Sequence, residues 1–121
     1  MPIRSILAVD DSRLARMMLR EAVLKSRPEC VFREAGTAEE ALNATRQQIP
    51  DLFLIDLNMP GMNGIDLAME ISRIAPGVPM ALLTANIQDK VKLRAESIGL
   101  IFLEKPISSD RLGALLAQLD V

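Results

Sequence analysis

The side chains in this 121-residue chain that could carry out chemistry share one position. Each lies at or just after the end of a short apolar run. They are Asp10, Asp11, Asp56, Asn58, Thr84 and Lys105. If the apolar runs are parallel strands, their carboxyl ends meet at one edge of a sheet, where such folds bind ligands. The sequence therefore predicts a polar site at that edge, centred on Asp56.

The charges in this group indicate a metal-assisted reaction on a carboxylate. Two carboxylates about 4 Å apart repel by roughly 4 kcal/mol at an effective dielectric of 20. One lysine cannot neutralise three acids, so either a carboxyl takes up a proton or a divalent cation binds. An all-oxygen set suits Mg²⁺, or Mn²⁺, and such ions often coordinate phosphate. Lys105 could hold a phosphoryl oxygen as a point charge, and Thr84 could donate its hydroxyl hydrogen.

Each of these residues also has a structural interpretation. Asp11 or Ser12 could cap a helix, and Asn58 could belong to a turn with Pro60 and Gly61. Thr84 could be an edge hydroxyl, and Lys105 a solvated charge. The arrangement of all of them at successive strand ends favours a functional site over these separate explanations.

Composition excludes several functions. Aromatic residues make up 2% of the chain, and Trp, Tyr and His are absent, so stacking on bases or on a flavin and catalysis by histidine are not expected. The formal net charge of −2 provides no basic field for nucleic acid. We expect no signal peptide and no membrane span, and the single Cys30 is consistent with the cytoplasm.

The elements that must position the site alternate along the chain. Strands are expected at residues 6–9, 31–35, 52–55, 78–83 and 100–103. Helices are expected at residues 12–25, 37–48, 63–74 and 89–97, and from Ser108 or Ser109 to the end. Capping is predicted for Thr37, with Glu40 completing a capping box. This order predicts an α/β fold, (βα)₅, with a parallel sheet covered on both faces.

Two helices carry apolar stripes that predict their buried faces. In the first helix Leu14, Met17, Met18 and Ala22 are spaced by three and four residues and should face inward. In the last helix Leu112, Leu115, Leu116 and Leu119 form the same pattern.

The motifs 9–12 (Val-Asp-Asp-Ser), 56–64 (Asp-Leu-Asn-Met-Pro-Gly-Met-Asn-Gly), Thr84-Ala85 and Lys105-Pro106 resemble those of receiver domains of two-component response regulators, including single-domain chemotaxis-type regulators. They occur in order with matching spacing, and the resemblance covers the whole chain. It implies a flavodoxin-like, doubly wound sheet with strand order 2-1-3-4-5, and one receiver domain spanning residues 1–121.

The resemblance also implies roles for individual residues. Asp56 would accept the phosphoryl group, with Lys105 and Thr84 binding it. The metal would be held by Asp10, Asp11 and Asp56 and by the backbone carbonyl of Asn58. The Lys105–Pro106 peptide would be cis. Thr84 and Phe102 would form the switch, and Asn58 and Asn86 would tune the lifetime of the phosphate.

The partners implied are a histidine kinase or a histidine phosphotransfer protein as donor, and a downstream effector. The effector would bind the face made by the fourth helix, fifth strand and fifth helix. The exposed residues expected there are Lys90, Lys92, Arg94, Glu104 and Arg111. The first helix, with Arg13, Arg16 and Arg20, would dock the phosphodonor. A homodimer formed on phosphorylation is left open, and neither direct nucleic-acid binding nor membrane binding is expected.

Three other functions fit this set of residues less well. A haloacid-dehalogenase-type phosphatase also uses an aspartate nucleophile with Mg²⁺, but needs a second Asp where this chain has Asn58. A flavodoxin needs a phosphate loop and aromatics that are missing. A binding module that signals without phosphate would not need the intact acidic set. The chain could be a stand-alone protein or a fragment of a longer regulator or hybrid kinase, and the sequence leaves both open.

Overall fold

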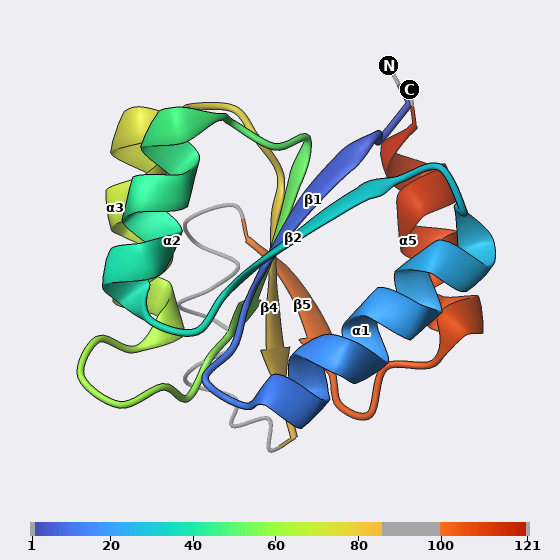
Figure 1. Cartoon of the computed structure of the whole chain (residues 1–121), viewed down its shortest axis with the longest axis horizontal. Helices are drawn as coiled ribbons and strands as arrows, with labels where there is room; N and C mark the ends of the chain where they lie inside the picture. The colour runs from blue at the N-terminus through green and yellow to red at the C-terminus, as the bar shows by residue number, and fades with distance from the viewer. Residues whose placement is uncertain (1, 86–99, 121) are drawn as a thin grey trace.

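The computed structural model, which describes residues 2–85 and 100–120, contains one five-stranded parallel sheet (Figure 1). The strands are β1 (Ser5–Val9), β2 (Val31–Ala35), β3 (Leu52–Asp56), β4 (Met80–Thr84) and β5 (Ile101–Glu104). The helices are α1 (Arg13–Ser26), α2 (Ala38–Gln47), α3 (Gly64–Ile74) and α5 (Ser109–Leu119). The strand order is β2-β1-β3-β4-β5, which confirms the predicted topology. The helix expected at residues 89–97 lies outside the described residues.

Two layers of helices cover the sheet. The helices α1 and α5 lie on one face, and α2 and α3 on the other (Figure 1). Every residue of β3 and of β4 is buried, because each of these inner strands is covered on both sides. Their side chains alternate between two cores: Leu52 and Leu54 face the α1 and α5 side, whereas Phe53 and Ile55 face α2 and α3.

Strand ends differ slightly from the sequence prediction, and the differences bear on the site. The strand β3 includes Asp56, and β4 extends to Thr84, so both polar residues lie within the sheet rather than beyond it. The strand β4 begins at Met80 instead of residue 78. Pro79, which has no N–H to donate, contributes only its carbonyl, which accepts a hydrogen bond from the Phe53 N–H.

The side chains of Ser12, Thr37, Asn63 and Ser108 each accept a backbone N–H at the start of a helix, as N-caps do. The predicted capping by Thr37 and Glu40 is present in a modified form. The Thr37 hydroxyl accepts from the Glu40 N–H, while the Glu40 carboxylate accepts from the N–H of Gly36 instead of Thr37. Short polar residues thus define where each helix begins.

The predicted inner face of α1 is wrong for three of its four residues, whereas Ala22 is buried as predicted. Leu14, Met17 and Met18 are between 52% and 66% exposed, and the buried side chains are Leu19, Ala22 and Val23. Leu19 lies five residues after Leu14, or about 140° around the helix, so the sheet covers the side of α1 that carries Leu19 and Val23 instead. Helix α5 follows its prediction: Leu112, Leu115 and Leu116 are buried, and Leu119 packs against the same core.

The two ends of the described chain lie together (Figure 1). Asp120 accepts a hydrogen bond from the Ile3 N–H and pairs with the guanidinium of Arg27, which also donates to the Ile3 carbonyl. These hydrogen bonds and this ion pair connect the end of α5 to the start of β1 and to the end of α1. Across residues 2–85 and 100–120, no helix combines the length and the apolar character that crossing a membrane requires.

Candidate functional site

Three carboxylates gather at the carboxyl ends of β1 and β3. These strands are neighbours, with Val9 opposite Ile55, so Asp10 and Asp56 follow side by side. One carboxylate oxygen from each of Asp10, Asp11 and Asp56 lies within 4.8 Å of the others. Asp10 and Asp56 are buried, whereas Asp11 is exposed. The sheet register therefore brings together the acids that the sequence placed in separate motifs.

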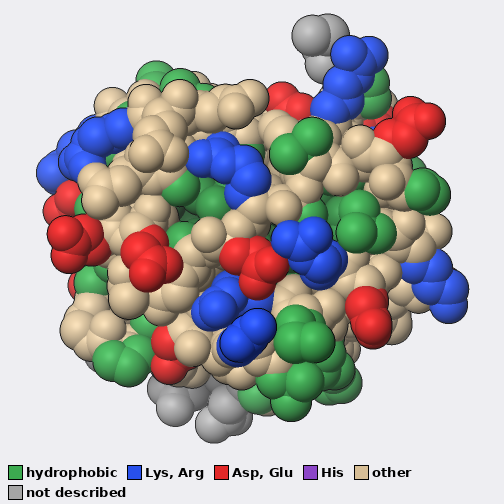
Figure 2. All heavy atoms as spheres, in the orientation of Figure 1, with side chains coloured by type: hydrophobic (Ala, Val, Ile, Leu, Met, Phe, Trp, Pro, Cys, Tyr) green, Lys and Arg blue, Asp and Glu red, His purple; other side chains and the backbone are tan. Residues whose placement is uncertain are grey.

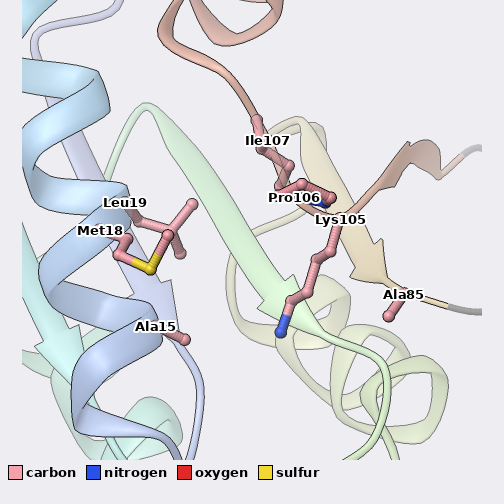
Figure 3. A pocket seen from close by; sticks show the side chains of 7 residues that line it. All are labelled: Ala15, Met18, Leu19, Ala85, Lys105, Pro106 and Ile107. Atoms are coloured by element: carbon pink, nitrogen blue, oxygen red, sulfur yellow. The ribbon is translucent and has the colours of Figure 1, made fainter.

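Lys105 joins two of these acids. Its Nζ lies 3.0 Å from Asp10 Oδ2 and 3.3 Å from Asp56 Oδ1. The lysine follows β5 and is held there by a 2.7 Å hydrogen bond from its N–H to the Thr84 carbonyl, and the Lys105–Pro106 peptide is cis, as predicted. In Figure 3 its side chain extends from this loop toward the carboxyl end of β3.

The environment shifts the pKa values of both partners. Burial raises the pKa of Asp56, and the charge of Asp10 acts in the same direction; Lys105 and the Asn58 N–H offset part of this effect. Burial alone would lower the pKa of Lys105, but its hydrogen bond to Asp10 and the charge of Asp56 outweigh it and raise that pKa. The lysine is therefore held as a cation between two anions.

The oxygens of this group fit a divalent cation. Three carboxylates and one ammonium leave two negative charges, which a Mg²⁺ ion would balance. Both oxygens of Asp10 already accept hydrogen bonds, from the Ser12 N–H and from Lys105. The Asp11 carboxylate has no hydrogen bond or ion pair with the described residues. Asp11 and Asp56 therefore have lone pairs to offer, and Asp10 is better placed to act through water.

The loop after β3 closes tightly over Asp56. The Asn58 N–H lies 3.4 Å from Asp56 Oδ1, and the Gly64 N–H donates to the Leu57 carbonyl. A Cβ on Gly64 would lie 2.5 Å from the Asp56 carbonyl oxygen, so only glycine fits there. Gly61 turns the loop with φ of 85°, a conformation that favours glycine.

Two of the remaining predicted residues, Thr84 and Phe102, lie on the strands β4 and β5. Thr84 ends β4 and is buried at the same edge of the sheet. Phe102 is half-buried on β5 and packs against the core under α2 and α3. Asn58 is exposed in the loop after β3, and Asn86 lies outside the described residues.

Two of the α1 arginines that were predicted to dock the phosphodonor, Arg16 and Arg20, also form ion pairs within the chain. Arg16 and Arg20 both pair with Glu34 on β2, each at 3.0 Å, and Arg16 also donates to the Asp10 carbonyl. Sequence reasoning missed Glu34 because nothing local connects it to the site. Its only sequence signal is an acid two residues before Gly36, at the end of the edge strand.

An apolar pocket of about 310 Å³ opens beside Lys105. Its walls come from α1 and from the loop between β5 and α5 (Figure 3). They are formed by Ala15, Met18, Leu19, Ala85, Lys105, Pro106 and Ile107. On the face shown in Figure 2, hydrophobic side chains also gather at the surface over the start of α1, where Leu14, Met17 and Met18 are exposed.

The sequence of this chain is similar to one protein family and to several known proteins. The family described as response regulator receiver domain matches residues 6–117. The chemotaxis protein CheY of Thermotoga maritima is 34% identical over 109 residues, covering 89% of this chain and 90% of that protein. The transcriptional regulatory protein PdtaR of Mycobacterium tuberculosis is 39% identical over 116 residues, covering 93% of this chain but 55% of that longer protein.

The fold itself is matched by the chemotaxis protein CheY4 of Vibrio cholerae. Its structure superimposes with a TM-score of 0.87 at 24% identity, covering 97% of this chain and 98% of that one. The chain thus spans nearly all of one type of relative and about half of another.

Proposed function

Because this chain belongs to the response regulator receiver domain family, a family of phosphoacceptors in two-component signalling, we propose that Asp56 is the residue phosphorylated. One observation carries the assignment. Asp56 is the buried carboxylate whose Oδ1 is held by both Lys105 and the Asn58 N–H, while Oδ2 makes no hydrogen bond with the described residues. It is oriented, and one oxygen is available for attack.

In the proposed reaction a carboxylate oxygen of Asp56 forms a bond to phosphorus as the bond from phosphorus to the donor atom breaks. The donor is a phosphohistidine of a histidine kinase or of a histidine phosphotransfer protein. Lys105 would move from pairing with the Asp56 carboxylate to pairing with a phosphoryl oxygen. Water later cleaves the acyl phosphate, releases inorganic phosphate and restores the carboxylate, which makes the chain a switch rather than an enzyme acting on other substrates.

Mg²⁺ or Mn²⁺ would be held by Asp11 and Asp56, with Asp10 acting through water and Asn58 through its backbone carbonyl. Such an ion screens the negative charges of the acids and of the incoming phosphoryl group. The two negative charges that remain at the three carboxylates after pairing with Lys105 support this assignment.

We further propose that Thr84 and Phe102 transmit phosphorylation to the surface, and that Asn58 and Asn86 tune the lifetime of the phosphate. The added charge of roughly −1.5 to −2 would attract the Thr84 hydroxyl and Lys105, and so shift the ends of β4 and β5. Phe102 lies on β5, two residues from Glu104, whose carbonyl accepts from the exposed Arg111. These last two residues lie on the proposed effector face.

The phosphodonor is proposed to dock on α1 and the loop after β5. The apolar surface made by Leu14, Met17 and Met18 adjoins the pocket next to Lys105, which suits the apolar side chains of a partner helix. Arg13, Arg16 and Arg20, which were predicted from the sequence to dock the donor, lie on the same helix, and Arg16 and Arg20 also pair with Glu34. Residues 1–121 would act as one receiver unit.

The test is phosphorylation by acetyl phosphate with Mg²⁺, followed by intact-protein mass spectrometry. Wild type should gain the mass of one phosphoryl group, and Asp56→Asn should gain none. Asp11→Asn should label much more slowly at low Mg²⁺ concentration. Unlabelled wild type would contradict the proposal and favour a module that signals without phosphate, whereas labelling of Asp56→Asn would move the acceptor to another residue.

A further inference from the structure

Arg16 lies just outside the acidic pocket and contacts its backbone. Its Nε lies 3.0 Å from Glu34 Oε1, and its Nη1 donates a 2.5 Å hydrogen bond to the Asp10 carbonyl. The side chain is 17% exposed, so these bonds are made in a partly desolvated position.

The Asp10 carbonyl matters because it shares a planar peptide with the nitrogen of Asp11. Fixing that carbonyl fixes the peptide plane that carries the Asp11 nitrogen and Cα, and so restricts where the Asp11 side chain can start. Asp10 is further held by hydrogen bonds at its N–H and at both carboxylate oxygens. The Asp11 carboxylate has no such contact with the described residues, so its placement depends on the backbone.

We propose that Arg16 is a positioning residue that orients Asp11 for binding of the divalent cation, and that Glu34 holds Arg16 in place. This inference rests on the proposed Mg²⁺ site. It assigns to an arginine of α1 and an acid of the edge strand β2 a role in metal affinity, although neither touches the metal.

Two features of the structure support this role of Arg16 and Glu34. Burial acts to raise the pKa of Glu34, but the hydrogen bonds that it accepts from Arg20 and Arg16 together outweigh burial and lower that pKa. Gly36 leaves room for the guanidinium: a Cβ at that position would lie 3.2 Å from Arg16 Nη1, closer than side chains normally approach. Figure 2 shows Lys or Arg side chains beside Asp or Glu side chains where α1 and β2 lie at the front.

Whether removal of Arg16 weakens or strengthens Mg²⁺ binding distinguishes a positioning role from a simple electrostatic one. Arg16 carries a positive charge near the cation site, so removing that charge should strengthen Mg²⁺ binding if charge alone matters. Removing a positioning contact should weaken binding. Loss of partners outside the ligand shell typically costs tenfold to a hundredfold in metal affinity, which exceeds the screened effect of one charge.

The experiment is an NMR titration of the full chain with Mg²⁺ alone, following the backbone amides of the loops after β1 and β3. Arg16→Met should raise the Kd for Mg²⁺ about tenfold. Arg20→Met is the matched control, because Arg20 lies on the same helix and pairs with the same Glu34 but makes no bond to Asp10. Its Kd should stay within about twofold of wild type or fall slightly. Glu34→Gln should weaken binding less than Arg16→Met.

An unchanged or lower Kd in Arg16→Met, with the protein folded, would overturn the inference. Thermal unfolding without Mg²⁺ reports folding, and a merely structural role would lower the Tm of the Arg16 variant without changing its Kd. If Arg16→Met does not fold, Gly36→Ala crowds the guanidinium without removing it and should also weaken binding. Failure of wild type to bind Mg²⁺ would instead contradict the proposed function.

Discussion

At Asp56, the requirements of reactivity and of stability conflict. The carboxylate is 6% exposed and lies beside Asp10, and burial followed by this neighbouring charge raises its pKa. A solvent-exposed aspartate would destabilise the folded protein less, but it would lack the fixed orientation that Lys105 and the Asn58 N–H give to Asp56. The site thus contains destabilising charge that a bound cation can relieve.

This conflict predicts that Asp56→Asn stabilises the protein at neutral pH without Mg²⁺. Because the pKa is higher in the folded chain than its ordinary value of 3.8, folded wild type binds more protons than unfolded wild type between the two values. Stability of wild type therefore falls as pH rises through this window. We expect a gain of roughly 1 kcal/mol, or about 4 °C in Tm, at pH 7.

Urea unfolding at several pH values checks this expectation. The advantage of Asp56→Asn should shrink as pH falls through the raised pKa and disappear below about 3.8. Asp11→Asn is the control, since Asp11 is exposed, and should gain less. An advantage of the Asn variant that is independent of pH would show that ionisation is not its cause. Saturating Mg²⁺ should narrow the gap by stabilising wild type.

At the scale of the elements, the loop between β3 and α3 is restricted by a close backbone contact at Gly64. The start of α3 passes so close to the end of β3 that a Cβ on Gly64 would lie 2.5 Å from the Asp56 carbonyl oxygen and 2.8 Å from the Leu57 Cα. Both are backbone atoms, which cannot move without shifting the strand. The glycine therefore keeps the first turn of α3 against the residue that is proposed to be phosphorylated.

We expect Gly64→Ala to cost at least 2 kcal/mol, roughly the scale of overpacking in a core, and to slow labelling of Asp56. Gly61→Ala provides a comparison in the same loop. A Cβ there meets nothing within 4 Å, and only the φ of 85° is unfavourable, so the cost should be about 1 kcal/mol. Chemical denaturation of both variants measures these differences, and an equal or smaller cost for Gly64→Ala would mean that the backbone relaxes at that contact.

For the whole molecule, the apolar surface next to the site consists of segments far apart in the sequence. Met18 on α1 and Ile107 after β5 line the same pocket as Lys105. The packing of α1 against α5 on one face of the sheet brings these segments together (Figure 1). A partner helix bound there would lie directly beside the proposed phosphoacceptor.

Met18→Glu should slow phosphotransfer from a phosphorylated histidine kinase about tenfold, corresponding to roughly 1.4 kcal/mol of lost contact. Labelling by acetyl phosphate, which needs no docking, should be unchanged. Met69→Glu is a matched control, because Met69 is 41% exposed on α3 on the opposite face. The donor would be the kinase of the source organism that labels wild type fastest. Equal slowing by both variants would place docking elsewhere.

Much of the site followed from the sequence because its motifs are local. Asp10 and Asp11, Asp56 and Lys105 each come at the end of an apolar run, and a parallel sheet necessarily brings such ends to one edge. Helix starts were also predictable, because Ser12, Thr37 and Asn63 cap through bonds that span three residues. In these cases the information lies within a few positions of the residue concerned.

Tertiary structure alone decided which side of α1 faces the sheet and what its arginines contact. Apolar residues lie on more than one side of that helix, and only packing against the sheet and α5 shows that Leu19 and Val23 are buried while Met17 and Met18 are not. The contact of Arg16 with Glu34 depends on the pairing of β2 beside β1, which spacing does not encode. Sequence thus determined the local motifs, whereas the long-range contacts required the fold, because they join residues that only the sheet brings together.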